Sequence, residues 1–137
     1  MKVYLEEGAF APVREHPTDA GLDIRAKDAQ IVPARGTATF YTGVHIQLPP
    51  NTAGVFVSKS GLNINHDITS TGLIDEGYTG AVVVKLHNHG DTAYYVMRGD
   101  KISQIVITPV LYEDVEITTE PLPDTPRGSD GFGSTGR

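Results

Sequence analysis

The sequence predicts an all-β, jelly-roll-like subunit with a flexible, glycine-rich C-terminal arm.

 
Three observations support this prediction. Apolar residues come in short bursts rich in Val, Ile and Tyr, and 15 Gly and 9 Pro interrupt them. No stretch free of Gly and Pro holds a 3.6-residue apolar period long enough for a long helix. Many short strands separated by turns are typical of sandwiches, barrels and jelly rolls, which manage their sheet edges without helices.

The limits of each strand can be predicted, because residues that favour turns bound each apolar burst. Pro49 and Pro50 mark one such turn and Gly99 marks another, since proline fixes φ and glycine accepts positive φ. One or two helical turns are expected near residues 60–65. Residues 71–80 predict a hairpin whose tip holds Glu76 and Gly77. The predicted strands are residues 3–5, 22–25, 37–42, 44–48, 54–58, 81–86, 93–97, 102–107 and 112–117.

The chain has 137 residues, of which 39% are hydrophobic, and this is enough for one domain with its own core. We expect residues 1–119 to form a β-barrel or jelly-roll catalytic domain. Residues 120–137 should form a mobile arm that closes over the active site, because Pro, Gly, Ser and Thr displace the aliphatic residues there and the segment cannot bury itself.

Composition narrows the classes of function. The chain has no Cys, which excludes disulfides and thiolate zinc sites. A formal net charge of -6 argues against a nucleic-acid binder. The first ten residues hold two carboxylates and no apolar stretch, so no signal peptide is predicted. The longest purely apolar run, residues 81–84, is far below the ~18 residues of a membrane span. We therefore expect a soluble, cytoplasmic protein.

Two segments place carboxylates beside glycine. Asp23 enters a predicted strand shortly after Gly21, and an alternative role for it is to cap a turn. Asp75 and Tyr78 flank the tip of the predicted hairpin. A carboxylate beside an exposed ring is suited to holding a sugar, because the carboxylate accepts from a hydroxyl while the ring packs on the apolar face.

A third segment, Lys59-Ser60-Gly61, follows a strand and opens the predicted helical turn. Its ammonium group, its hydroxyl and free backbone N–H groups suit an anion. The spacing is not that of a P-loop, and Ser60 as an ordinary N-cap is the alternative interpretation. Gln104 is a polar residue inside an apolar strand, so its side chain needs partners.

The C-terminal segment formally matches G-x-G-x-x-G at residues 131–136, but no strand precedes it and no helix follows, so it is not a dinucleotide fingerprint. Its glycine N–H groups, its hydroxyls and Arg127 still suit an anion. Phe132 is the one large side chain among these glycines, and its ring could stack on a base. An ordinary disordered tail is the alternative.

Five segments together resemble, in order and spacing, the five motifs of the trimeric deoxyuridine triphosphatase (dUTPase) family. They are DAGLDIRA at 19–26, SKSGLN at 58–63, TGLIDEGYTG at 71–80, RGDKISQIVI at 98–107 and RGSDGFGSTG at 127–136. The resemblance implies a homotrimer of jelly-roll-like subunits that hydrolyses dUTP to dUMP and pyrophosphate with Mg²⁺. It also implies that each active site is shared among three chains.

The resemblance further implies roles for single residues. Asp75 would be catalytic, orienting and activating the attacking water, and Tyr78 would stack beneath deoxyribose and exclude a 2′-hydroxyl. Asp23 would hold the waters on magnesium. The family usually has Arg at the position of Lys59, and at the position of Thr69 it has an Asn that helps to bind uracil. Uracil contacts are implied for Gly72, Leu73, Ile74 and Val83, phosphate contacts for Lys59, Ser60, Gly61 and Gln104, and the closing arm for Arg127, Phe132, Gly133, Ser134 and Thr135.

Two rival functions stay open from the sequence. A dCTP deaminase shares the subunit fold and the trimer, but that family lacks an arm of this form and relies on a catalytic glutamate that the chain does not evidently supply. A dUTPase-like module that binds a regulatory protein is the non-enzyme alternative. The presence of Asp75 and Tyr78 argues against lost turnover, although it leaves room for a second, regulatory partner.

Overall fold

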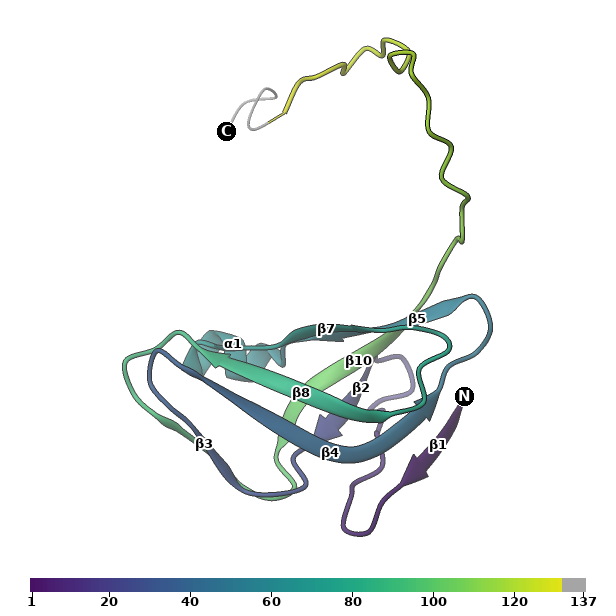
Figure 1. Ribbon diagram of the computed structural model, residues 1–137. Helices are drawn as coiled ribbons and strands as arrows, with labels where there is room; N and C mark the ends of the chain where they lie inside the picture. Colours follow the sequence, from purple (N-terminus) through teal and green to yellow (C-terminus); the bar gives the residue numbers. More distant parts are fainter. Residues whose placement is uncertain (132–137) are drawn as a thin grey trace.

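The computed structural model describes residues 1–131, and within them the chain is all-β apart from one short helix (Figure 1). No helix in this range has the length and apolar character that a membrane crossing requires. The elements are β1 Lys2–Leu5, β2 Gly21–Arg25, β3 Gln30–Val32, β4 Thr37–Gln47, β5 Thr52–Val57, α1 Ser60–His66, β6 Ile68–Thr69, β7 Thr71–Ile74, β8 Ala81–Asn88, β9 Tyr94–Val96 and β10 Lys101–Pro109.

The strands form two four-stranded antiparallel sheets, ordered β1-β4-β8-β6 and β2-β10-β5-β7, and a two-stranded sheet of β3 and β9. Figure 1 shows the two larger sheets as layers, and the core lies between them. Strand β8 shows how the strands build this core. Its side chains alternate, so Val82, Val84 and Leu86 point inward while Val83 and Lys85 face outward. This two-layer arrangement of antiparallel strands confirms the predicted jelly-roll-type fold.

Strand β4 was predicted as two strands and is one. Its pairing with β8 shifts register between Tyr41 and His45, where Gly43 has a φ of 67°. The strand therefore passes through a bulge instead of turning back. A side chain at Gly43 would approach Glu6 and Ala9 to 3.3 and 3.1 Å, so glycine also allows the segment after β1 to lie close.

The hairpin predicted for residues 71–80 is wrong in its pairing. Strand β7 pairs with β5, whereas β8 pairs with β4 and β6, so the two strands that flank the turn belong to different sheets. Alternation of apolar residues shows that strands exist, but the choice of partner depends on tertiary packing. This separation leaves a gap between β7 and β8 that a paired hairpin would have closed.

The short helix α1 was expected, but Ser60 is not its N-cap. Lys59 occupies that position with extended backbone, and Ser60 is the first helical residue. The helix ends at His66, and Asp67 caps it: Asp67 has left-handed backbone and donates its N–H to the carbonyl of Leu62. No residue of α1 is buried, so the helix acts as a connection between β5 and β6.

The strand predicted at residues 112–117 is also wrong. These residues belong to no strand of the described chain, and Val115 and Ile117 are 89% and 91% exposed. The strand before them, β10, already has β2 and β5 on its two edges, so the sheet offers no place beside it. In the described chain, regular structure thus stops at Pro109, eleven residues before the predicted start of the arm at residue 120.

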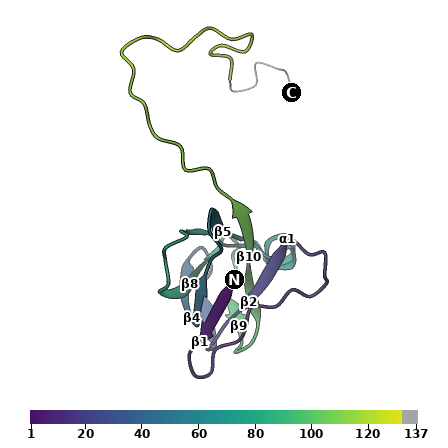
Figure 2. The same ribbon diagram turned by 90° about the vertical axis from the view of Figure 1, so that its right-hand side faces the viewer.

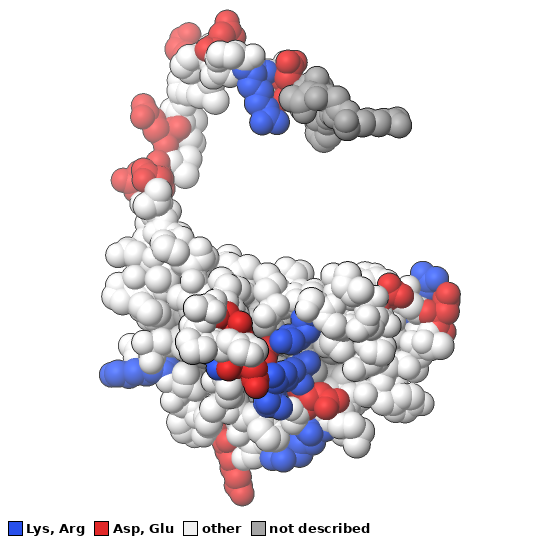
Figure 3. Space-filling model, turned by 180° about the vertical axis from the view of Figure 1, so that it is seen from behind, with Lys and Arg blue, Asp and Glu red and all other residues white. Residues whose placement is uncertain are grey.

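Beyond β10 the chain runs away from the two sheets, as both Figure 1 and Figure 2 show. Between residues 110 and 131 it carries six carboxylates and one arginine. Figure 3 shows acidic side chains spaced along this arm, whereas Lys and Arg gather on the body of the subunit beside other acidic groups. Most of the net negative charge therefore lies outside the folded body.

Candidate active site

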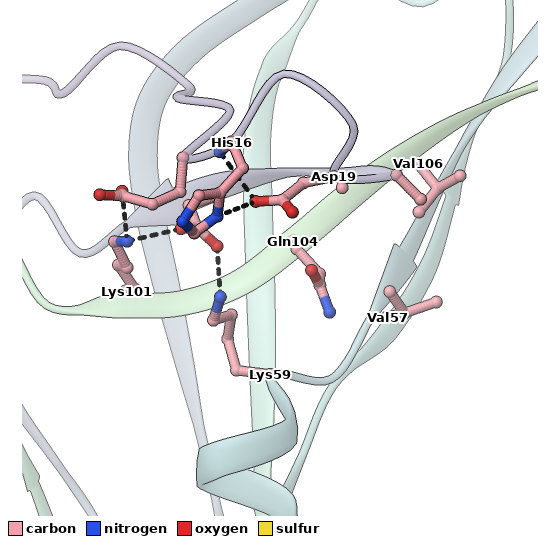
Figure 4. A pocket seen from close by; sticks show the side chains of 11 residues that line it. His16, Asp19, Val57, Lys59, Lys101, Gln104 and Val106 are labelled. Atoms are coloured by element: carbon pink, nitrogen blue, oxygen red, sulfur yellow. Dashed lines mark hydrogen bonds and ion pairs between the residues drawn. The ribbon is translucent and has the colours of Figure 1, made fainter.

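A pocket of about 480 Å³ opens between the second sheet and the loop before β2 (Figure 4). Strands β2, β5 and β10 supply its floor, and Lys59 enters from the start of α1. The pocket is lined by Glu15, His16, Asp19, Ala20, Gly21, Asp23, Val57, Lys59, Lys101, Gln104 and Val106.

Asp23 is the charged centre of this pocket. Its side chain is only 7% exposed, and its two oxygens face the ammonium groups of Lys59 at 2.5 Å and Lys101 at 2.8 Å. Figure 4 shows the two lysines approaching from different elements. Burial raises the pKa of Asp23, but the hydrogen bonds from Lys101 and Lys59 outweigh burial and lower it overall. Asp23 is thus held as a carboxylate.

Three serines, of which Ser70 and Ser103 are buried and Ser58 is partly buried, fix the backbone from which Lys59 extends. The Ser58 hydroxyl donates to the Ser70 carbonyl at 3.1 Å and accepts from the Ser70 N–H at 2.9 Å. The hydroxyls of Ser70 and Ser103 are 2.8 Å apart, and Ser103 also donates to the Val57 carbonyl at 3.2 Å. The end of β5 is therefore tied to β10 immediately before Lys59.

Gln104 has the partners that an inward polar side chain needs. Its amide donates to the Ser58 carbonyl at 3.1 Å, and the side chain lies across Gly21. A Cβ at position 21 would come within 2.5 Å of the Gln104 amide oxygen and 3.1 Å of its Cβ. Glycine at position 21 is consequently a condition for Gln104 to occupy the pocket.

A second pocket, of about 250 Å³, lies in the gap between β7 and β8. It is lined by Leu73, Ile74, Asp75, Tyr78, Ala81 and Val83. Because β7 pairs only with β5 among the described strands, and β6 meets β8 only at Asn88 and His87, the facing backbone edges of β7 and the start of β8 carry no strand partner in the described chain. Their N–H and C=O groups are available to a flat polar ligand.

The turn at residues 75–80 presents the candidate catalytic groups to this second pocket. The Tyr78 N–H donates to the Asp75 carbonyl at 3.0 Å, and the Tyr78 hydroxyl donates to the Ala81 carbonyl at 3.0 Å. The ring is thereby fixed, although Tyr78 is 46% exposed. Asp75 is exposed, and no side chain or backbone N–H within residues 1–131 hydrogen-bonds its carboxylate.

The other candidate residues are more dispersed. Ser60 and Gly61 are exposed at the start of α1, and Gly72 is exposed on β7 next to the second pocket. The Thr69 hydroxyl lies 2.8 Å from His89 Nε2 at the far end of β8. Arg127 is exposed on the arm, where its Nε donates to the Asp130 carbonyl at 3.3 Å. The remaining arm predictions, Phe132, Gly133, Ser134 and Thr135, fall outside the described residues.

Sequence reasoning missed Lys101 and Glu15. Lys101 Nζ lies 2.9 Å from Glu15 Oε2 and 2.8 Å from Asp23 Oδ2, and all three residues line the first pocket. Lys101 stands three residues before Gln104 in a segment already singled out, so its position was a usable signal. Nothing in the sequence around Glu15 distinguishes it from a surface carboxylate.

The two pockets share no lining residue, so one chain presents two separate pockets with different chemistry. The first offers two ammonium groups, a carboxamide and a carboxylate, which suits polyphosphate and a hard cation. The second offers a carboxylate, a fixed ring and unpaired backbone edges, which suits a nucleoside. Within the described residues, no three His, Asp or Glu side chains gather closely enough to cage a metal by themselves.

Comparison with known proteins adds a family. The family model described as dUTPase matches residues 8–136. The chain is 44% identical over 135 residues to the deoxyuridine 5′-triphosphate nucleotidohydrolase of Gloeothece citriformis, covering 96% of this chain and 92% of that protein. It is 42% identical to the protein of the same name from Clostridium acetobutylicum, with the same coverage.

Solved structures agree with the sequence comparison. The dUTPase of Staphylococcus bacteriophage 80alpha, solved with dUpNHpp, superposes with a TM-score of 0.92 at 27% identity, covering 99% of this chain and 98% of that one. A variant dUTPase from phage phi11 of S. aureus, solved to describe the coordination of a structural Mg(II) ion, gives a TM-score of 0.80 at 26% identity, covering 87% and 96%.

Proposed function

The chain belongs to the dUTPase family, and we propose that it hydrolyses dUTP to dUMP and pyrophosphate with Asp75 as its catalytic residue. The observation that carries the assignment of the site is the gap between β7 and β8. It places an exposed carboxylate and a fixed aromatic ring at the mouth of a slot whose walls are unpaired backbone edges. These three features together suit a deoxynucleoside.

Uracil would enter the slot and be read by the backbone of Gly72, Leu73 and Ile74 and of the strand at Val83. Backbone N–H and C=O groups complement the alternating acceptors and donor on the edge of uracil. The strand at Val83, which lines the slot, would lie close to the base and exclude the methyl group of thymine. Thr69, whose hydroxyl is engaged with His89, would lie at the closed end of the gap.

Tyr78 would select the sugar. Its ring is held by the hydroxyl contact to Ala81, so it cannot swing away from a ligand without losing that hydrogen bond. A ring stacked beneath deoxyribose leaves no room for a 2′-hydroxyl. The exposed carboxylate of Asp75 would accept a hydrogen bond from the 3′-hydroxyl and also hold the attacking water.

The reaction is a displacement at the α-phosphorus. The water oxygen forms a bond to phosphorus, the bond to the oxygen that bridges the α- and β-phosphates breaks, and pyrophosphate leaves with that oxygen. Asp75 would take the proton of the water as negative charge develops on the leaving group. Positioning and neutralisation of phosphate charge supply most of the remaining catalysis in such transfers.

The phosphates would be bound by the first pocket, through Lys59, Ser60, Gly61 and Gln104. Lys59 is paired with Asp23 at 2.5 Å in the ligand-free protein, so it must turn from Asp23 toward the phosphate. Asp23 keeps Lys101 as a partner when this happens. With two lysines around it, the nearly buried Asp23 would still have a cationic partner after Lys59 turns to the phosphate.

The residues of this pocket fit magnesium held mainly by substrate. Mg²⁺ keeps several waters and is commonly bound through one or two carboxylates plus phosphate oxygens. Asp23, nearly buried and facing the pocket, would hold those waters, and no all-protein cage is needed. When bound, Mg²⁺ supplies neutralisation of the phosphate charge.

A homotrimer with shared sites is part of the proposal. The two half-sites of one chain have no residue in common, and the arm leads away from the body that carries them. Closed cyclic symmetry would bring the half-sites of different chains together. The arm, through Arg127, Phe132, Gly133, Ser134 and Thr135, would then close a site. Cytoplasmic location and a role in cleansing the nucleotide pool and supplying a dTTP precursor stay predictions.

Neither rival function gains support. The relatives found are nucleotidohydrolases of dUTP by name, so a deaminase is not favoured. The decisive measurement is release of pyrophosphate with dUTP, dCTP, dTTP and UTP side by side, with and without Mg²⁺. We expect turnover with dUTP that far exceeds turnover with the other three. A preference for dCTP, or no turnover of any nucleotide, would overturn the proposed function.

Asp75→Asn tests the catalytic residue. Because an amide can orient water but accepts its proton poorly, turnover should fall by about 10²- to 10⁴-fold while dUTP still binds. Asp28→Asn, which changes an exposed aspartate between β2 and β3, is the matched control and should keep full turnover. Undiminished turnover in Asp75→Asn would remove Asp75 from the mechanism.

A further inference from the structure

The turn at residues 75–80 is held from outside by two tethers, because its flanking strands do not pair with each other. On one side, Glu76 Oε2 accepts from the Asn51 N–H at 2.9 Å and from the Tyr112 hydroxyl at 2.7 Å. On the other side, the Thr79 carbonyl lies 2.8 Å from Nδ1 of His45. The second tether adjoins Tyr78.

His45 stands on β4 just after the bulge at Gly43, and a cluster of side chains surrounds it. Its Nε2 lies 3.2 Å from Glu6 Oε1, and the same oxygen accepts from the Tyr41 hydroxyl at 2.5 Å. Lys27 Nζ contacts the other Glu6 oxygen at 3.2 Å. The Tyr4 ring lies 5.3 Å from the His45 ring, and Lys2 lines the same shallow pocket.

Both ring nitrogens of His45 face an oxygen that can only accept. A neutral imidazole donates through one nitrogen, so its other lone pair would point at an oxygen. The geometry is satisfied on both sides only by the doubly protonated ring. The Thr79 carbonyl and then the Glu6 carboxylate raise the pKa of His45 above its ordinary 6.5. Tyr41, His45 and Lys27 lower the pKa of Glu6 to about 2, so the anion persists.

We propose that His45 is a positioning residue, which as an imidazolium ties the turn of residues 75–80 to Glu6 and so sets the place of Tyr78 for substrate. The inference rests on the proposed function, because it assigns Tyr78 to the sugar. His45 does not itself line the second pocket. It reaches that pocket through the Thr79 carbonyl next to Tyr78 and through its pairing with Ala81 in the β4–β8 ladder.

Loss of one proton from the His45 imidazolium would weaken its contact with the Thr79 carbonyl and keep its contact with Glu6. The single N–H that remains is better satisfied by a carboxylate than by a neutral carbonyl. The Nδ1 lone pair would then face the Thr79 oxygen, and that tether would weaken. Because the folded-state pKa is raised, the contribution is complete below pH 6.5 and is lost as the pH rises through the raised value. The KM for dUTP should therefore rise with pH more than kcat falls.

The test compares pH profiles of KM and kcat for the wild-type full chain and three variants. In His45→Asn, the amide nitrogen takes the place of Nδ1 and can still donate to Thr79, but the side chain does not titrate. At every pH, the KM of His45→Asn should stay near the KM that the wild type shows at low pH. His45→Ala should raise KM about tenfold at all pH values, as expected of one hydrogen bond from a charged donor.

Glu6→Gln is the third variant, and it removes the anion while leaving an oxygen that can accept from the ring. The His45 pKa should fall, so the rise in KM should begin at a lower pH than in the wild type. Titration of the His45 ring by NMR, in wild type and in Glu6→Gln, measures the same shift of the His45 pKa and does not depend on turnover.

Two results would overturn the inference. One is a wild-type KM profile that His45→Asn reproduces unchanged, and the other is a His45 ring that titrates at or below its ordinary pKa. Failure of the proposed function looks different, because the wild type would then release no pyrophosphate from dUTP at any pH. The ring titration still decides the protonation of His45 in that case.

Discussion

Asp23 shows how a single carboxylate can serve two states of one site. It is nearly buried, and burial alone would favour its neutral form, yet two ammonium groups hold it charged. In the proposed complex, in which Lys59 binds phosphate, Lys101 would remain the partner of Asp23. The sequence indicated Asp23 and Lys59 separately, through their motifs. It could not indicate their contact, because 36 residues separate them and the fold alone brings them together.

Lys101→Met tests this arrangement through its dependence on pH. Removal of Lys101 leaves burial to act more strongly on Asp23, so the variant should be less stable than wild type at pH 7. The lowered pKa of Asp23 means that its contribution is present above 3.8 and lost as the pH falls through the lower folded-state value. The difference in free energy of unfolding should therefore narrow in acid. Urea unfolding at pH 7 and pH 3 measures it.

Lys85→Met provides the control for that measurement, since Lys85 is an exposed lysine on the outward face of β8. The free energy of unfolding of this variant should differ little from that of wild type, and the difference should change little between the two pH values. If the difference in free energy of unfolding between Lys101→Met and wild type is also the same at pH 7 and pH 3, then Lys101 does not hold Asp23 in its charged form.

At the scale of elements, strands inside the two sheets were predictable because their apolar alternation is regular. Strand β3 escaped prediction because it is short and only Val32 in it is buried. Residues 112–117 were predicted from similar alternation, but they cannot pair with the preceding strand β10, whose two edges are taken by β2 and β5. The gap between β7 and β8 could not be predicted either, since the turn between them is equally compatible with a paired hairpin. The second pocket exists because these strands separate.

Gly21→Ala tests how strands β2 and β10 position the first pocket. The added methyl group would meet the Gln104 side chain at 2.5–3.1 Å, so Gln104 must leave its contact with the Ser58 carbonyl. We expect kcat/KM for dUTP to fall about tenfold to hundredfold, the usual cost of displacing a positioning group. The melting temperature should change little, because Gln104 can turn toward the open pocket.

Gly77→Ala is the matched control for stability, because nothing lies within 4 Å of the added Cβ. If Gly21→Ala lowers the melting temperature by far more than Gly77→Ala, its effect on turnover reflects damage to the sheet. If Gly21→Ala leaves kcat/KM unchanged, then Gln104 does not contribute to phosphate binding.

For the whole molecule, the distribution of charge matters more than its sum. The net charge of -6 would oppose a triphosphate if it surrounded the site. Residues 1–109 carry eleven carboxylates and nine lysines or arginines, so the body that holds both pockets is close to balance. The excess negative charge lies on residues 110–137. An acidic linker that extends itself by repulsion suits a segment that, in the proposed trimer, would reach another chain.

The shared-site assembly can be tested by mixing two inactive chains. One carries Asp75→Asn, and the other ends before Arg127 and so lacks the tip of the arm. The truncated chain should stay folded, because Arg127 contacts only its own segment in the described structure. Its kcat/KM should nevertheless fall by several orders of magnitude, because the phosphates lose their cover. Light scattering should give the mass of three chains for each protein.

In mixed trimers, a site works only if its Asp75 comes from a truncated chain and its arm from an Asp75→Asn chain. If these parts come from different chains, co-expression in equal amounts should restore about a quarter of wild-type turnover by random assembly. If both parts come from one chain, every site lacks either the carboxylate or the arm, and no turnover returns. A mixture that stays inactive while it forms mixed trimers would therefore place the arm on its own chain's turn.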